Sequence, residues 1–170
     1  MKQGCLVFLA ALFCLPVFSQ QGGVGVLPLN ALPADGLVLD QHWTFHPKDD
    51  IHYAESWEIV DKGISLNPAG KLDQLPEVKK AGIGWFRLKM QVDPSLRNKT
   101  IGMMVSLFGA AEIYLNGKQV YQYGQVSPVY TQEKTQAIYA RAVSLTLGNE
   151  DYQLLAVRFS NHPNNLNVHT

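Results

Sequence analysis

Apolar and polar side chains alternate strictly along residues 85–92. The apolar positions are Phe86, Leu88, Met90 and Val92, and those between them are Trp85, Arg87, Lys89 and Gln91. Successive side chains of a β-strand point to opposite faces, so a period of two is typical of a strand with one face against a core. The segment is therefore predicted to be a strand whose second, largely polar face points outward.

The same period of two recurs in other short segments. They are residues 37–47, 100–108, 142–147 and 152–160, together with the two arms of a hairpin at residues 116–117. Trp43 and Phe45 are expected to point inward from the first of these. Residues 100–108 are apolar on both faces, which indicates a strand deep in a layered sheet. Many short strands with almost no helical period predict an all-β fold, an antiparallel β-sandwich.

Asn116 and Gly117 give the strongest turn signal in the chain. Both central residues of a type I′ turn need positive φ, which Asn tolerates and Gly adopts freely. An Asn-Gly pair between two alternating arms therefore predicts a β-hairpin. In its first arm, Ile113 and Leu115 are expected to face the core and Tyr114 to face outward.

The remaining segments are predicted to be turns and loops. Residues 93–95 have the sequence Asp-Pro-Ser, which is typical of a turn that ends a strand. Residues 20–35 are rich in Gly and Pro and are expected to form a linker or an arm along a sheet edge. Residues 48–55 are predicted to be a polar loop, and only a short helical turn is expected around 72–80.

The first nineteen residues resemble an export signal, with Lys2 before a long apolar run and small residues near position 19. Cleavage would start the mature chain near Gln20, in a periplasmic or extracellular location. A retained N-terminal anchor is the alternative, although the run is shorter than the ~20 residues that span a bilayer. Both cysteines, Cys5 and Cys14, lie inside this segment, so no disulfide or cysteine metal site is expected in the mature protein.

Composition narrows the choice of partners. About 150 mature residues suffice for one hydrophobic core without covalent cross-links. Loss of Lys2 from fourteen basic residues leaves thirteen against fourteen acidic ones. With no basic run, nucleic acid is not expected as a partner. No later stretch is apolar for long enough to span a membrane. The length of the mature chain predicts one sandwich domain, placed at residues 36–162.

The histidines raise the question of a metal site. His42 and His46 have the spacing used by helical zinc sites. In a strand, however, four residues separate them by about 13 Å, too far for one zinc ion. His42, His46, His162 and His169 are therefore expected to be surface or loop residues, and no metal ligand or cofactor is predicted.

No residue pattern predicts catalysis. The sequence has no nucleophile elbow, no phosphate-binding loop and no separated carboxylate pair typical of glycoside chemistry. An acidic loop with Asp49, Asp50 and Glu55 could offer oxygen ligands to calcium, but its spacing matches no calcium loop. A solvated loop is the alternative.

Binding is the function that the outward face of the predicted strand suggests. Trp85 shares that face with Arg87, and an indole beside a guanidinium group can stack on a sugar while Arg bonds its oxygens. Arg158 is a similar candidate. The competing interpretation is structural: Trp covers an edge of the sandwich and Arg pairs with a carboxylate of a neighbouring strand.

Tyrosines gather in and after the hairpin, at Tyr114, Tyr121, Tyr123 and Tyr130. Tyrosine gives broad contact area at low entropy cost, which suits interfaces. Tyr114 and Tyr121 are therefore added to the candidate ligand-binding residues. Tyrosine is also common in strands, so a purely structural role is the alternative.

An ordered set of motifs resembles a known fold family. They are Gly84-Trp85-Phe86-Arg87, the Asp93-Pro94 turn, Glu112 to Lys118, and Leu155 to Asn161. In this order they resemble a galactose-binding-like jelly roll, over residues 36–162. Two branches are similar: the extracellular N-terminal domains of bacterial membrane signalling proteins such as sensor histidine kinases, and the sugar-binding domain of glycoside hydrolase family 2.

The sensor branch fits the sequence better, because the order of Trp43, Trp57 and Trp85 after a signal peptide is similar to it. This resemblance implies a periplasmic domain that senses a small ligand such as a carbohydrate, or another protein. Its membrane and output domains would be missing here, with 163–170 as the polar start of a truncated continuation. The alternative is a carbohydrate-binding accessory domain of a glycoside hydrolase, and a third possibility is a structural adhesion module. None of these places catalysis in this chain or predicts its oligomeric state.

Overall fold

The computed structural model describes three stretches of the chain, residues 25–55, 63–66 and 76–162. The predicted signal segment 1–19, Trp57 and the polar tail 163–170 lie outside these described residues. The described part forms an all-β antiparallel sandwich of jelly-roll type, as the sequence predicts. No helix in this part of the chain has the length and apolar character needed to cross a membrane.

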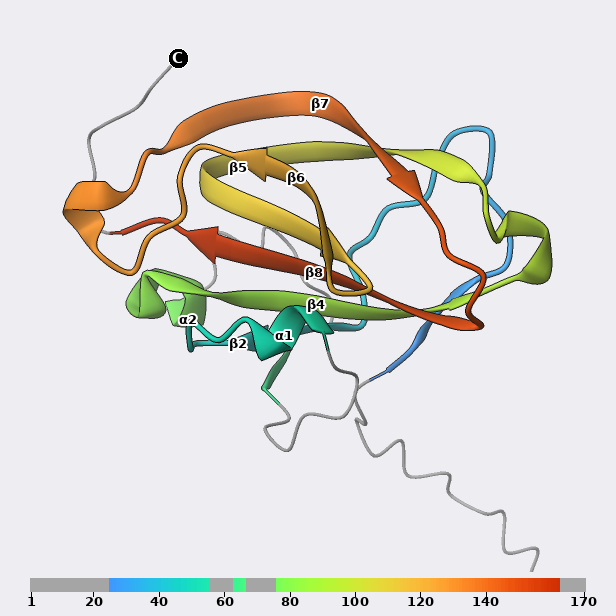
Figure 1. Ribbon diagram of the computed structural model, residues 1–170, viewed down its shortest axis with the longest axis horizontal. Helices are drawn as coiled ribbons and strands as arrows, with labels where there is room; N and C mark the ends of the chain where they lie inside the picture. Colours follow the sequence, from blue (N-terminus) through green and yellow to red (C-terminus); the bar gives the residue numbers. More distant parts are fainter. Residues whose placement is uncertain (1–24, 56–62, 67–75, 163–170) are drawn as a thin grey trace, which may run out of the picture.

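Eight strands and two short α-helices make up the described part. They are β1 (Leu27–Leu29), β2 (Trp43–His46), α1 (His52–Glu55), β3 (Ile64–Leu66), α2 (Pro76–Ala81), β4 (Ile83–Val92), β5 (Thr100–Leu115), β6 (Lys118–Tyr123), β7 (Gln136–Thr146) and β8 (Tyr152–Ser160). Their main hydrogen-bonded path runs in the order β3-β2-β4-β8-β5-β6. Strand β7 pairs with β5, and β1 pairs in parallel with β4. Figure 1 shows β7 in one layer and β4 and β8 in the other.

Strand β5 belongs to both layers. Its first part pairs with β7, from Thr100 opposite Thr146 to Gly109 opposite Gln136, and its last part pairs with β8 and β6. The strand bends back on itself between these parts (Figure 1). Gly109 lies at the change with φ of 142°, and a Cβ there would come within 2.6 Å of the carbonyl oxygen of Ser160. The two strands expected from the sequence are therefore one, because glycine lets the chain bend without ending the ladder.

The hydrophobic core lies between the layers. Trp43 and Phe45 both belong to it, which confirms their predicted inward orientation. The rings of Phe45 and Phe86 are 5.0 Å apart, and those of Phe86 and Phe159 are 5.9 Å apart. Since these rings come from β2, β4 and β8, the core joins strands that are distant in sequence.

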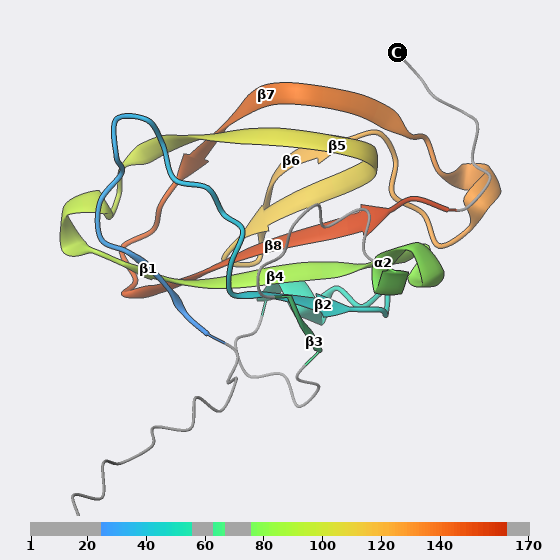
Figure 2. The same cartoon turned by 180° about the vertical axis from the view of Figure 1, so that it is seen from behind.

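The expectation that residues 100–108 lie deep in the sandwich is wrong. Their inward side chains are only half-buried, while Met104 and Phe108 on the other face are 64% and 40% exposed. In the described part of the chain, this layer consists only of β7 and the first half of β5 (Figure 2). A two-sided apolar pattern indicates burial only when another layer covers the second face.

The hairpin between β5 and β6 forms as predicted. Asn116 and Gly117 have φ of 49° and 80°, as a type I′ turn requires. The Asn116 side-chain oxygen also accepts a 2.8 Å hydrogen bond from the backbone N–H of Leu154. Ile113 and Leu115 lie in the core, so their predicted orientation is confirmed.

The segments predicted as loops contain more structure than expected. In the arm 20–35, β1 runs along β4 and buries Leu27 and Leu29 (Figure 2). The polar loop 48–55 contains α1, and α2 lies where a helical turn was expected. At 93–95, the Asp93 side chain accepts a 2.8 Å hydrogen bond from the backbone N–H of Ser95, which confirms the predicted turn.

Candidate functional site

Helix α1 covers the face of β4 that the sequence predicts to be exposed. Tyr53 and Ala54 of this helix form a second buried cluster with Trp85, Tyr114, Leu154 and Ala156. Trp85 is 0% exposed and Arg87 is 8% exposed, so their predicted accessibility to a ligand is wrong. Both residues do point away from the main core, as the alternation requires. Coverage by four residues of helix, and not strand orientation, excludes solvent there.

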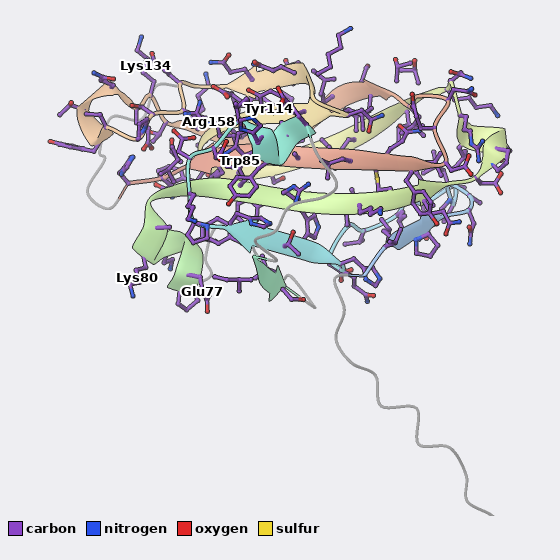
Figure 3. All side chains as sticks on the ribbon, turned by 60° about the horizontal axis from the view of Figure 1, so that its bottom comes forward. Glu77, Lys80, Trp85, Tyr114, Lys134 and Arg158 are labelled. Carbon is purple, nitrogen blue, oxygen red and sulfur yellow. The ribbon has the colours of Figure 1, made fainter. Side chains whose placement is uncertain are left out.

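Tyr114 is held in the same cluster (Figure 3). Its ring centroid is 5.3 Å from that of Trp85, and its hydroxyl donates a 2.9 Å hydrogen bond to Glu112 Oε2. Burial, reinforced by this bond to a carboxylate, raises the pKa of Tyr114 to about 12. Its predicted outward direction is correct relative to the core, but its side chain is buried.

Arg87 is fixed by the helix that covers it. Its Nε donates a 2.8 Å hydrogen bond to the backbone oxygen of Tyr53. Burial lowers the pKa of Arg87 below its usual value. This contact ties β4 to α1 and gives Arg87 a structural role, although the partner is a backbone carbonyl and not the carboxylate of a neighbouring strand that the structural alternative expects.

Arg158 joins two carboxylates. Its Nε and Nη2 donate to the two oxygens of Asp49 at 2.6 and 2.7 Å, and its Nη1 lies 3.2 Å from both oxygens of Glu112. These bonds, first those to Asp49, raise the pKa of Arg158 further above its usual value. Glu112 is the register partner of Arg158 on the neighbouring strand β5. The structural alternative, in which Arg pairs with a carboxylate of a neighbouring strand, is therefore confirmed.

The expectation that His46 is a surface or loop residue is wrong. It lies in β2 and is 1% exposed. Its ring is 4.4 Å from that of Tyr53 in α1. Coverage by the 48–55 segment again buries a side chain that alternation places on the outer face.

The acidic loop uses its carboxylates within the protein. Asp49 binds Arg158, and Asp50 Oδ1 is 2.8 Å from His52 Nδ1. The bond to His52 lowers the pKa of Asp50, and the same pair raises the pKa of His52. Within residues 25–55, 63–66 and 76–162, no three His, Cys, Asp or Glu side chains lie close enough to hold one metal ion.

The tyrosines after the hairpin divide into two kinds. Tyr123 is buried in the core, whereas Tyr121 is 38% exposed. Their ring centroids are 4.8 Å apart. Tyr130 lies in a single 3₁₀ turn and is also exposed. Of the five candidate ligand-binding residues, Tyr121 is the most exposed, and its predicted role stays a prediction.

An open groove lies beyond the outer edge of this region, where the segment after β6 meets the segment before β7. Its volume is about 530 Å³, and its lining residues are Gln122, Gly124, Gln125, Lys134 and Gln136. We call it the amide groove. The sequence does not predict this groove. Its two segments meet at an isolated bridge between Gln125 and Lys134, which no local residue pattern indicates. The density of glutamines along residues 119–136 is the one sequence signal that could have pointed to it.

Gly124 sets the close approach of the two groove segments. Its φ is 65°, and a Cβ at this position would collide with the carbonyl oxygen of Lys134. Reciprocal backbone hydrogen bonds of 3.0 and 3.1 Å join Gln125 and Lys134 directly beside it. The backbone of Gly124 therefore lines the groove at a position that tolerates no side chain.

Buried neighbours anchor the second segment. Glu133 and Thr135 are 2% and 0% exposed, while Lys134 between them is exposed. Glu133 Oε2 accepts a 3.2 Å hydrogen bond from the backbone N–H of His162, just after β8. This alternation turns Lys134 outward and fixes its segment to the rest of the sandwich.

Several solved structures resemble this fold at low sequence identity. One is a calcium-binding mutant of Bacteroides uniformis β-glucuronidase 2, with a TM-score of 0.51 and 20% identity over 75% of this chain. Two are structures of a glycosyl hydrolase family 2 member from Bacteroides cellulosilyticus, with TM-scores of 0.51 and 0.53, identities of 18% and 17%, and coverage of 75% and 79% of this chain. The sequence matches no protein-family model, and no curated protein matches it.

The present chain covers only a small part of each of these structures. It spans 15% of the β-glucuronidase 2 chain and 18% and 19% of the two B. cellulosilyticus chains. At such identities the likeness establishes the fold, an all-β sandwich, and nothing about its ligand.

Proposed function

We propose that this chain is a carbohydrate-binding accessory domain of a glycoside hydrolase. The observation that carries the proposal is the fold likeness to family 2 glycosyl hydrolases, each of which is more than five times longer than the region shared with this chain. All the similar structures named above are glycoside hydrolases. This supports the accessory role over the sensor role expected from the sequence.

The contacts of two described carboxylates, Asp49 and Glu112, favour a role without catalysis. Retaining and inverting glycosidases need two carboxyl groups that flank the scissile bond and reach the substrate. Asp49 and Glu112 are close to each other through Arg158, but that guanidinium group occupies both of them. The amide groove, by contrast, presents polar groups to solvent, which suits binding.

A glycan array with the chain lacking residues 1–19 tests the proposal. We expect retention of at least one class of glycan, with no release of reducing ends from that glycan in solution. Binding of no glycan on a broad array would contradict the carbohydrate-binding role. Release of reducing ends by this chain alone would contradict the accessory role.

A further inference from the structure

We infer that the amide groove is the saccharide site of this domain and that it selects a sugar carrying a carboxylate group. The inference rests on the proposed carbohydrate-binding function and adds a location and a ligand class to it. Its basis is the chemistry of the lining residues, the bonds that hold Gln122 and the groove backbone, and the charges around them.

The lining residues offer many hydrogen-bonding groups and one charge. Three carboxamides, from Gln122, Gln125 and Gln136, each present donors and an acceptor, and Lys134 presents an ammonium group. Sugar hydroxyls both donate and accept, so they match carboxamides. Among the residues that the structure describes, no carboxylate lines the groove, so Lys134 is the charged group that a ligand meets there. A carboxylate on the sugar would form a charge-assisted hydrogen bond with it.

The Gln122 side chain and part of the groove backbone are held in place by bonds within the protein. Gln122 Nε2 donates a 2.9 Å hydrogen bond to the backbone oxygen of Gly124, and its Oε1 accepts one of 3.3 Å from Gln119 Nε2. The Gln125 and Lys134 backbones are bonded to each other. The Gln122 side chain and the bonded backbone therefore lose less conformational entropy on binding than mobile groups would.

The acidic groups near the groove are directed elsewhere. Glu133, next to Lys134 in sequence, is buried and accepts from the backbone N–H of His162. Glu112 is the register partner of Gln122, but both its oxygens bind Arg158. Neither carboxylate lines the groove, so neither takes the place of the ligand's carboxylate on Lys134.

Calorimetric titration of the chain tests this inference with two acidic probes, trigalacturonate and a hyaluronan tetrasaccharide. Each is compared with its fully methyl-esterified form, which keeps the sugar rings but lacks the carboxylate charge. We expect at least one acidic probe to bind and its ester to bind about tenfold more weakly or worse, as loss of a charged hydrogen bond implies.

Two lysine variants locate the site. Lys134→Met should weaken binding of the acidic probe about tenfold or more and leave binding of the ester unchanged. Lys118→Met, at an exposed position at the start of β6, is the matched control and should change neither. Gln136→Ala should weaken both forms, because its amide contacts the sugar ring.

Three outcomes would overturn the inference. They are equal affinity for acid and ester, acidic binding indifferent to Lys134→Met, and no binding of either acidic probe. If the glycan array is positive in any of these cases, the accessory role stands and only the groove or its ligand class is wrong. If the array is negative, the proposed function fails with it.

Discussion

Two regions on one face of the main sheet differ in how they are covered. Trp85, Arg158, Glu112 and Gln122 are successive register partners across β4, β8, β5 and β6, so all four point to the same side. At the β4 end, α1 buries Trp85, whereas beyond β6 the amide groove is open. Figure 3 shows Trp85, Tyr114 and Arg158 close together and Lys134 apart from them.

This difference separates residues that stabilise the fold from residues that are open to a ligand. The covered region contains aromatic rings and a guanidinium group, the residue types expected at a sugar site, but it uses them to attach α1 and Asp49 to the sheet. The open region contains carboxamides and a lysine. We therefore expect substitutions in the first region to change the free energy of unfolding and those in the second to change binding.

Trp85→Ala should give the largest effect. Removal of a fully buried indole is expected to lower the free energy of unfolding by about 3–5 kcal/mol. Denaturant titration followed by circular dichroism measures the loss. Tyr139→Ala is the control, because Tyr139 is 85% exposed and its removal should change stability by less than about 0.5 kcal/mol. A loss below about 1 kcal/mol for Trp85→Ala would contradict the assigned burial.

Gly124→Ala should affect the groove and stability together. Alanine at φ of 65° costs about 1–2 kcal/mol, and the collision of its Cβ with the Lys134 carbonyl adds to this. We expect a loss of about 2 kcal/mol or more and weaker binding of the acidic probe. Gly102→Ala is the matched control, since nothing lies within 4 Å of a Cβ there. Equal stability of the two variants would show that the close approach at Gly124 is not needed.

Tyr114→Phe should change how stability depends on pH. The pKa of Tyr114 is raised from 10.0 to about 12 in the folded protein, so the folded state keeps a proton that the unfolded state loses between these values. The contribution of the protonated Tyr114 hydroxyl to the free energy of unfolding is therefore complete below pH 10 and is lost as the pH rises toward 12. The wild type should lose about 2 kcal/mol more than the variant over this range. Denaturant titrations of both proteins at pH 9, 10 and 11.5 measure this. A difference in the free energy of unfolding between wild type and variant that stays the same at all three pH values would contradict the raised pKa.

Tyr121→Ala should give the smallest effect. Its ring contacts Tyr123 but is partly exposed, so a loss of about 1 kcal/mol or less is expected. Tyr121 is opposite Ile113, which faces the core, whereas Gln122 faces the groove. Affinity for the acidic probe should therefore stay unchanged. A clear loss of affinity would instead support the ligand-binding role that the sequence predicts for Tyr121.

Local patterns predicted the strands and the hairpin because the signals are contained in a few adjacent residues. Alternation identified β4 and β8, and Asn116-Gly117 identified the turn. Which strand faces are covered by other segments could not be predicted in the same way. The burial of Trp85 depends on α1, which is 30 residues earlier in the chain and too short to have a helical period.

The groove and the continuity of β5 also depend on distant contacts. The sequence predicts two strands where β5 is one, because at Gly109 the strand bends and its backbone comes close to that of Ser160. The groove exists only because Gln125 meets Lys134. A glutamine-rich segment alone is equally consistent with a solvated loop, so no sequence rule places its side chains around one cavity.

Nuclear magnetic resonance of the ¹⁵N-labelled chain tests the central claim, that the open groove binds sugar and the covered region does not. The probe is the acidic oligosaccharide with the higher affinity. We predict that the side-chain amide signals of Gln122, Gln125 and Gln136 shift on titration, while the indole Nε1–H signal of Trp85 stays in place. Movement of the indole signal with unchanged groove amides would contradict the account.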